Sequence, residues 1–214
     1  MLPEAFERQL HHLKSQGYHT ITFADYLVHR RTSRPLPRRS IILTFDDGYR
    51  SNRSIAWPIL KHFGFGATVF IVSGLLGETN AWDRDAQQEP LLTATDVQEM
   101  QTEGAEFGSH TRTHAHLTAV PAALARDELQ HSRQDLEALC GKPVTVLGYP
   151  YSECNDQVKR LALDAGYEAA VIVRRRMNTD HTDLLSLRRI AVTPDTTINR
   201  FHWDLFRLRW FQGD

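Results

Sequence analysis

Two adjacent carboxylates, Asp46 and Asp47, directly follow the apolar run 41–45 and precede Gly48. The run is rich in β-branched and aromatic residues, which predicts a buried strand. Burying carboxylates is costly unless a metal ion or hydrogen bonds hold them. Because successive side chains of an extended strand point to opposite sides, the two acids are expected to do different jobs. The alternative is a polar turn in which Asp-Gly supplies the bend.

A second candidate cluster contains His110 and His114, which follow a short expected strand at 105–107. Two histidines four residues apart would share one face of a helical turn and could reach a single ion. Parallel α/β folds place catalytic groups where strands end, and both clusters are expected there. Asp47, His110 and His114 therefore predict a metal site with open coordination positions, which suits catalysis.

The residues around both clusters resemble a known family. Thr-Phe-Asp-Asp-Gly at 44–48 and His-Thr-Arg-Thr-His at 110–114 resemble the first two motifs of the polysaccharide deacetylases, the NodB-like carbohydrate esterases of family four. Gly-Tyr-Pro-Tyr at 148–151 resembles the third motif, in the form found in the poly-N-acetylglucosamine deacetylase branch. The resemblance covers roughly 6–192, which is most of the chain.

This resemblance implies a fold and a set of roles. The fold is α/β, a distorted (β/α) barrel of about seven parallel strands. The general base is Asp46, and the metal ligands are Asp47, His110 and His114. The cofactor is a divalent metal, usually zinc, with cobalt, nickel or manganese as alternatives. The implied substrates are N-acetylated amino sugars in a polysaccharide or a lipid-linked precursor, and the product is acetate.

The residue types independently support hydrolysis of an N-acetyl group. A divalent ion held by two histidines and a carboxylate lowers the pKa of a bound water from about 15.7 towards roughly 7. Asp46 would accept the proton as the water attacks the acetyl carbonyl. In the family, the main-chain N–H that stabilises the oxyanion belongs to the position of Tyr151, and one such donor contributes about 3 to 4 kcal/mol. The alternative for the Tyr151 ring is ordinary packing.

One departure from the family pattern concerns the residue that orients the base. The third motif usually begins with an arginine, but this chain has Gly148 at that position. Arg188 and Arg189, ahead of Ile190, could supply the missing cation from another strand end. The alternative is that both arginines belong to a solvated strand edge.

The second departure concerns the general acid. The common family form has a leucine-x-histidine motif near the C-terminus, and none follows Val192. In the poly-N-acetylglucosamine branch the histidine comes from a Tyr-His strand. That strand lies upstream of the segment that residues 2–6 resemble, so one interpretation is that the present chain lacks it. The candidate replacements are His116, His181 and His202. His116 is the nearest of these in sequence to His110 and His114. The alternative interpretation of His116 is an ordinary loop histidine.

Substrate contacts are expected from the third motif and from one loop. Tyr149 and Pro150 precede Tyr151 in the motif. The stretch 77–90 is expected to be an insertion loop over the site, in which Trp82 could stack on the face of a sugar. The alternative for Trp82 is an aromatic side chain that anchors its own loop.

Length and patterning favour one domain spanning 1–214. A chain of this length buries about 70% of its unfolded surface, enough for one core. Alternating strands and helices are typical of a parallel α/β layer or barrel. The expected strands lie near 41–46, 67–72, 105–108, 144–148, 169–173 and 187–192. The clearest helices are expected at 4–16 and 121–139, which Gly17 and Gly141 terminate.

Charge and hydropathy limit the expected partners. The net charge of −1, from 25 basic and 26 acidic residues, gives no global field for nucleic acid. No apolar run approaches the roughly 20 residues that span a bilayer, and the N-terminus has no signal-peptide pattern. We therefore expect a cytoplasmic location for the chain as written, and a periplasmic or cell-surface one if an export signal precedes it. The tail 201–211 predicts a terminal helix over the barrel, or alternatively a peripheral membrane contact, because aromatics mixed with arginines suit an interface.

Three functions fit these residues. The favoured one is a metal-dependent N-deacetylase, because a binding module has no evident need for a base beside a metal site. A non-catalytic glycan-binding relative is the second, motivated by the missing arginine and the missing acid. The third is a metal hydrolase of non-sugar amides.

Overall fold

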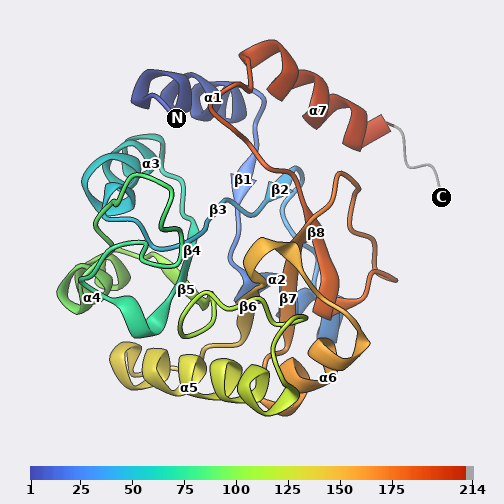
Figure 1. Cartoon of the computed structure of the whole chain (residues 1–214). Helices are drawn as coiled ribbons and strands as arrows, with labels where there is room; N and C mark the ends of the chain where they lie inside the picture. The colour runs from blue at the N-terminus through green and yellow to red at the C-terminus, as the bar shows by residue number, and fades with distance from the viewer. Residues whose placement is uncertain (211–214) are drawn as a thin grey trace.

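The computed structural model describes residues 1–210, and a curled sheet of parallel strands lies at its centre (Figure 1). The six strands of this sheet neighbour one another in chain order. They are β3 (Thr44–Phe45), β4 (Thr68–Ile71), β5 (Glu106–Ser109), β6 (Val146–Gly148), β7 (Ala169–Val173) and β8 (Leu187–Arg189). A separate parallel pair consists of β1 (His19–Thr20) and β2 (Ser40–Ile41).

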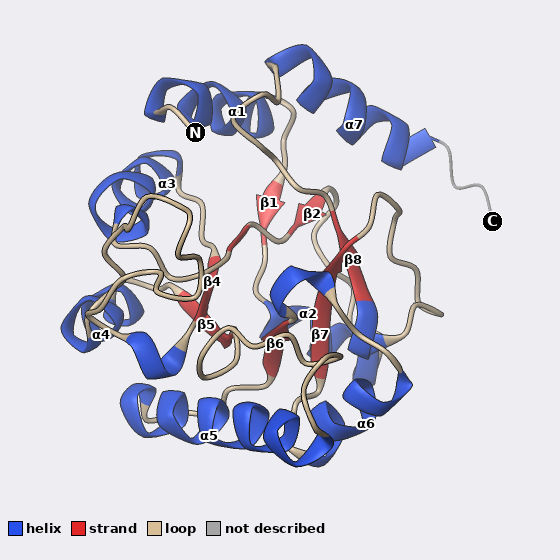
Figure 2. Ribbon diagram, in the orientation of Figure 1, coloured by secondary structure: helices blue, strands red, loops and turns tan. Residues whose placement is uncertain are grey.

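Helices surround the strands (Figure 2). They are α1 (Pro3–Ser15), α2 (Phe23–Thr32), α3 (Trp57–Phe63), α4 (Ala94–Thr102), α5 (Ala122–Cys140), α6 (Asp156–Asp164) and α7 (Ile198–Trp210). Short helical segments are the π-helix η1 (Asn52–Ala56) and the 3₁₀ turns η2 (Ser73–Leu75), η3 (Pro150–Ser152) and η4 (Leu184–Ser186). Capping boxes start α2 and α4, because in each the N-cap threonine and an aspartate three residues later bond each other's backbone N–H.

Alternating side chains divide the apolar core into two parts. Val69 and Ile71 of β4 pack in the larger cluster, which includes buried residues of the outer helices. Phe70, between them, belongs to a second cluster with Phe23 of α2, and the two rings are 6.0 Å apart. Glu106 of β5 accepts a 2.9 Å hydrogen bond from the Phe23 N–H, which fixes the start of α2 against the sheet. The inner face of the curled sheet is therefore packed against a helix and is not open.

Side chains join the two edges of the six-stranded sheet. Arg189, at the end of β8, donates a 3.0 Å hydrogen bond to the hydroxyl of Thr44 in β3. It also forms a two-pronged ion pair with Asp46, which follows β3, with both N–O distances at 2.6 Å. Because β3 and β8 are the first and last strands in sheet order, these contacts close the curl. The distorted barrel expected from the sequence is confirmed, with six strands in its sheet where about seven were expected.

The predicted strands are confirmed to within three residues at their ends, except that 41–46 is not continuous. β2 ends at Ile41 and pairs with β1, whereas β3 begins at Thr44 and pairs with β4. The chain changes sheets at 42–43, and this change of partner interrupts the strand. The two-residue strand β1 was not predicted, because two residues carry no readable alternation.

The predicted helices at 4–16 and 121–139 are confirmed as α1 and α5, and the tail forms α7. Figure 1 shows α1 and α7 side by side, and the rings of His12 and Phe201 meet at 6.2 Å. The last residue of the predicted tail, 211, lies outside the described residues. Among helices in the described part of the chain, none has the length and apolar character to cross a membrane.

Candidate active site

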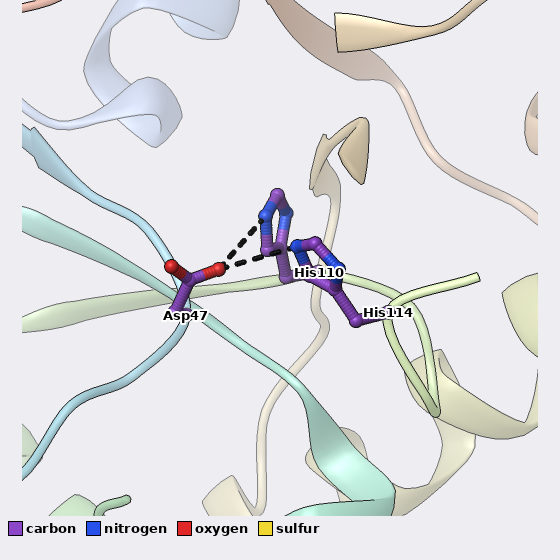
Figure 3. A group of neighbouring side chains, drawn as sticks. All are labelled: Asp47, His110 and His114. Atoms are coloured by element: carbon purple, nitrogen blue, oxygen red, sulfur yellow. Dashed lines mark ion pairs between the residues drawn. The ribbon is translucent and has the colours of Figure 1, made fainter. Parts of the chain in front are cut away.

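Asp47, His110 and His114 converge from two strand ends (Figure 3). One carboxylate oxygen of Asp47 lies 3.4 Å from Nε2 of His110 and 3.3 Å from Nε2 of His114. Ligand atoms held tetrahedrally at about 2.0–2.1 Å from a zinc ion lie about 3.3 Å apart, so both distances match a shared ion. Both histidine side chains are buried, and that of Asp47 is 23% exposed. The structure therefore brings together the three residues that the sequence predicted as metal ligands.

The hydrogen bond on the far side of His110 fixes how this ring can bind. Its Nδ1 lies 2.6 Å from the carbonyl oxygen of Gly148. A carbonyl only accepts, so Nδ1 carries the hydrogen and Nε2 points at Asp47. If the imidazole is neutral, a lone pair faces a carboxylate, and this arrangement is favourable only with a cation between them. The donor set and its orientation thus fit a divalent metal ion.

The ionisation of Asp47 follows the same electrostatics. Burial alone would raise the pKa of this carboxyl. With no metal ion bound, the hydrogen-bonding and Coulombic attraction of the His110 and His114 rings outweigh burial and hold the pKa of Asp47 well below its ordinary value. The carboxyl is therefore an anion at neutral pH, as a metal ligand must be.

The segment from His110 to His114 is a loop, so the expectation that a helical turn places the two rings on one face was wrong. Thr111 and His114 have φ angles of 65° and 63°, in the left-handed region that side chains disfavour. The two rings nevertheless meet, with centroids 4.9 Å apart. Because residues in this region cost about 1–3 kcal/mol each, the surrounding structure must hold the loop in place.

Glu128 of α5 holds this loop through three hydrogen bonds. Its carboxylate accepts from the N–H of Arg112 at 2.9 Å, from the N–H of Thr113 at 2.8 Å and from the Thr113 hydroxyl at 2.7 Å. Glu128 is 4% exposed. Glu128 was not predicted from the sequence, although a signal existed: it lies at an inward position of the helical repeat formed by Ala125, Leu129 and Ser132.

Substitution of Glu128 by alanine is expected to destabilise the fold and the metal site together. Loss of the carboxylate leaves two backbone N–H groups without their acceptor, at a cost of about 3 kcal/mol or more. Supporting contacts of this kind typically contribute 10–100-fold to metal affinity, so zinc binding should weaken by about that factor. Glu128→Gln keeps an acceptor oxygen and should lose less.

Urea unfolding and zinc titration of the two Glu128 variants measure these effects. Gln134→Ala, at an exposed position of the same helix, is the matched control. Wild-type zinc affinity in Glu128→Ala would show that the loop keeps its shape without this carboxylate.

The adjacent acids have different partners, as the sequence predicted. Asp47 has a φ angle of 71°, so the chain leaves the extended conformation there and turns its carboxylate towards the histidines. Asp46 instead meets Arg189, whose guanidinium donates to both of its oxygens. The Asp46 side chain is 34% exposed and that of Arg189 is 15% exposed. A two-pronged pair of this type fixes the plane of the carboxylate.

Packing explains why Gly148 stands where the family resemblance predicts an arginine. A Cβ atom at this position would lie 3.0 Å from both Nδ1 of His110 and Cγ of Phe70. The guanidinium of Arg189 lies over the same Phe70 ring, 5.4 Å from its centre, and reaches Asp46 from β8. Of the two predicted arginines, Arg189 is therefore the one at the site. Arg188 donates to the Met177 carbonyl instead.

Aromatic rings frame the metal-binding side chains. Trp82 stacks on His114 with ring centroids 4.6 Å apart, so the loop 77–90 reaches the site as expected. Tyr151 packs edge-on against His114 at 4.6 Å and is 47% exposed. Its φ angle of 56° adds a fourth left-handed conformation at the site, after Asp47, Thr111 and His114. Both rings therefore lie against a candidate metal ligand.

Among the candidate general acids, His116 is the one that contacts the rings beside His114. Its ring stacks on Tyr151 at 3.7 Å, and its Nδ1 lies 3.2 Å from both oxygens of Glu153. The other two candidates lie in different surroundings. His202 contacts His12 at the pairing of α1 and α7, and His181 is an exposed residue of the segment before η4.

Tyr149 and Pro150 are both buried, and Tyr149 is 1% exposed within the larger core cluster. This placement argues against the substrate contact predicted for their side chains. Within the third motif, Tyr149 and Pro150 therefore belong to the core, and Tyr151 is the first exposed residue.

Comparison with known proteins agrees with this fold. The polysaccharide deacetylase family model matches residues 33–170, more than half of the chain, so the chain belongs to the polysaccharide deacetylase family.

Individual relatives are similar over most of the chain. The poly-beta-1,6-N-acetyl-D-glucosamine N-deacetylase of Staphylococcus aureus (strain MRSA252) is 27% identical, over 94% of this chain and 71% of that protein. The Streptococcus pyogenes deacetylase PplD, solved in complex with acetate, superposes with a TM-score of 0.83 at 24% identity, covering 94% of this chain and 86% of PplD. IcaB from Ammonifex degensii gives a TM-score of 0.83 at 21% identity, covering 95% and 89%. The two structures show a shared fold.

Proposed function

We propose that this protein is a metal-dependent hydrolase that removes N-acetyl groups from N-acetylglucosamine units of a polysaccharide and releases acetate. The observation that carries the proposal is the arrangement at the strand ends: Asp46, oriented by Arg189, immediately precedes a carboxylate that shares a metal-binding geometry with two buried histidines. A general base beside a metal site is an arrangement that can hydrolyse an unactivated amide.

Each residue of the site has a part in this reaction. Asp47, His110 and His114 would hold the metal, and zinc suits this nitrogen and oxygen donor set, with cobalt, nickel or manganese as alternatives. A divalent ion bound there supplies Lewis acidity towards the acetyl carbonyl and acidifies water. Asp46 accepts the proton of the attacking water.

Two further groups would act on the tetrahedral centre and the leaving amine. The main-chain N–H of Tyr151 would donate to the developing oxyanion. His116, half exposed against the Tyr151 ring, would protonate the leaving amine. Nδ1 of His116 lies 3.2 Å from both carboxylate oxygens of Glu153, a contact that orients the ring.

The polymeric substrate is supported by a relative and by the shape of the site. The S. aureus relative is named for a β-1,6-linked N-acetylglucosamine polymer, and we propose this class of glycan as the substrate. Trp82 and Tyr151 flank the metal-binding side chains, where rings can pack on sugar faces.

A lipid-linked acetamido sugar is the second candidate substrate. The observation that favours it is on α7, where Trp203 and Phe206 are 54% and 41% exposed with their rings stacked at 5.8 Å. Exposed aromatics beside Arg200 and Arg207 suit an anionic lipid surface. Sedimentation with anionic vesicles, reduced in Trp203→Ala, is the expected result; no sedimentation of the wild-type chain would refute the membrane contact.

Arg189 weakens the case for a non-catalytic glycan-binding protein, because the missing third-motif arginine was one motive for that hypothesis and a guanidinium does orient the base. Acetate release from N-acetylglucosamine oligomers, compared with release from simple non-sugar acetamides, tests the proposal. Preference for the oligomers is expected. Preference for the simple amides would favour a different metal hydrolase, and oligomer binding without turnover would favour the binding protein.

Substitution of Arg189 by lysine or alanine is expected to lower kcat for acetate release by about 10–100-fold, the effect of lost orientation at a catalytic group. Lysine keeps the charge but not the fork that holds both oxygens of Asp46, so it should not restore the rate fully. Arg188→Ala is the matched control, because its side chain bonds to Met177. Steady-state kinetics with zinc titration separate the effects: metal affinity should stay near wild type, and wild-type kcat in Arg189→Ala would exclude the orienting role.

A further inference from the structure

A cleft of about 390 Å³ opens at Tyr49, two residues after Asp47. Its volume lies within the roughly 300–1,000 Å³ of small-molecule sites. The roles given above to the catalytic residues do not involve it. The lining residues are Tyr49, Arg50, Ser51, Ser54, Glu89 and Pro90.

Backbone hydrogen bonds join the two walls of the cleft. The N–H of Arg50 donates to the Pro90 carbonyl at 2.8 Å, and the N–H of Leu92 donates to the Gly48 carbonyl at 2.8 Å. Tyr49 pairs with Leu91 as an antiparallel bridge between them. The end of the loop 77–90 is therefore attached to the segment that follows β3, and these hydrogen bonds hold the two walls together.

The same loop connects the cleft to the metal-binding side chains. Its Trp82 stacks on His114, while its Glu89 and Pro90 form one wall of the cleft. Tyr49, which lines the cleft, follows Asp47 by two residues and pairs with Leu91, the residue after the loop. A chain-like substrate could thus contact Trp82, the catalytic carboxylates and the cleft in turn.

The side chains in the cleft suit a neutral, hydroxyl-rich ligand. Arg50 offers donors, Glu89 offers acceptors, and Ser51 and Ser54 offer both. The phenol of Tyr49 can donate as well as accept.

The charges in the cleft disfavour a simple anion or cation. The Nε of Arg50 lies 3.9 Å from the carboxylate of Asp96, which offsets part of its positive charge. A phosphate or carboxylate would also meet the negative charge of Glu89, and a simple cation would meet Arg50. A sugar unit with hydroxyl and acetamido groups uses donors and acceptors without a net charge.

We propose that this cleft binds the N-acetylglucosamine unit next to the unit being deacetylated, with Arg50 and Glu89 as its specificity-determining residues. The inference rests on the proposed function and deepens it. The protein would act on chains of sugars in preference to single sugars, because only a chain fills the cleft and the metal site together.

Kinetics with a β-1,6-linked N-acetylglucosamine pentamer and with the single sugar test this inference. Arg50→Ala and Glu89→Gln are expected to raise KM for the pentamer about tenfold each, the value of one hydrogen bond to a charged group. The kcat for the pentamer and both constants for the single sugar should not change. Arg126→Ala on α5 and Glu7→Gln on α1, both exposed and outside the cleft, are the matched controls.

Equal losses on the pentamer and the single sugar, or an unchanged pentamer KM, would overturn the assignment. A binding titration of the pentamer to the Asp46→Asn variant measures binding in the cleft without turnover. If adding Arg50→Ala weakens pentamer binding about tenfold, the cleft assignment is supported. This conclusion holds even if the wild-type chain releases no acetate, because the lack of acetate release would refute only the proposed function. Absence of pentamer binding, or binding that Arg50→Ala leaves unchanged, overturns the cleft.

Discussion

Asp46→Asn is expected to lower kcat for acetate release by about 10²–10⁴-fold, the usual contribution of a general base. An amide cannot accept the proton of the attacking water. It also presents an NH₂ group to the guanidinium of Arg189, where the carboxylate accepts two 2.6 Å hydrogen bonds. Because Asp47, His110 and His114 are untouched, zinc binding should stay near the wild-type level.

Acetate release and zinc titration on the same preparation separate catalysis from metal binding. Asp85→Asn, an exposed carboxylate in the loop 77–90, is the matched control. Near-wild-type turnover in Asp46→Asn would show that another group takes the proton. Loss of zinc binding together with turnover would mean that the substitution had disturbed the metal site.

His114→Ala is expected to abolish both tight zinc binding and acetate release. It removes one of three candidate ligand atoms that converge within the site. A residue that binds the metal directly should contribute more to metal affinity than the 10–100-fold that supporting contacts contribute. Calorimetric zinc titration should show affinity lower by more than about 100-fold. His131→Ala, an exposed histidine that pairs with Asp127 on α5, is the control.

The opposite outcome for His114→Ala is equally informative. Retention of wild-type zinc affinity would place the metal elsewhere in the protein. Retention of turnover with loss of zinc binding would mean that hydrolysis does not depend on this ion.

The cluster of candidate metal ligands could be predicted because residue type and order suffice to single it out, even when the assumed local structure is wrong. His110 and His114 were expected to share a helical face, yet left-handed backbone at Thr111 and His114 brings the rings together. Such a loop depends on Glu128, which is distant in sequence, so spacing alone could not reveal its conformation.

The choice between Arg188 and Arg189 could not be made from the sequence, because both precede the same apolar residue. The closure of the barrel decides it: Arg189 faces β3 and contacts Thr44 and Asp46, which lie at the opposite edge of the sheet. For the same reason the position of α2 against the inner face was not predicted. Long-range contacts determine it, including the contact from Glu106 to the Phe23 N–H.

The strand pattern was more predictable, because buried parallel strands are short apolar runs that the sequence displays directly. The exception at 42–43 is a change of partner between two sheets, and local composition does not encode which sheet a strand joins.

Metal-dependent acetate release is the most direct test of the account. The protein would be stripped with chelator, assayed on β-1,6-linked N-acetylglucosamine oligomers, and assayed again after one equivalent of zinc is restored. We predict no release from the stripped protein, recovery with zinc, and no recovery in His114→Ala. Undiminished acetate release from the fully stripped wild-type chain would contradict the account, because the Asp47, His110 and His114 cluster would then have no part in the reaction.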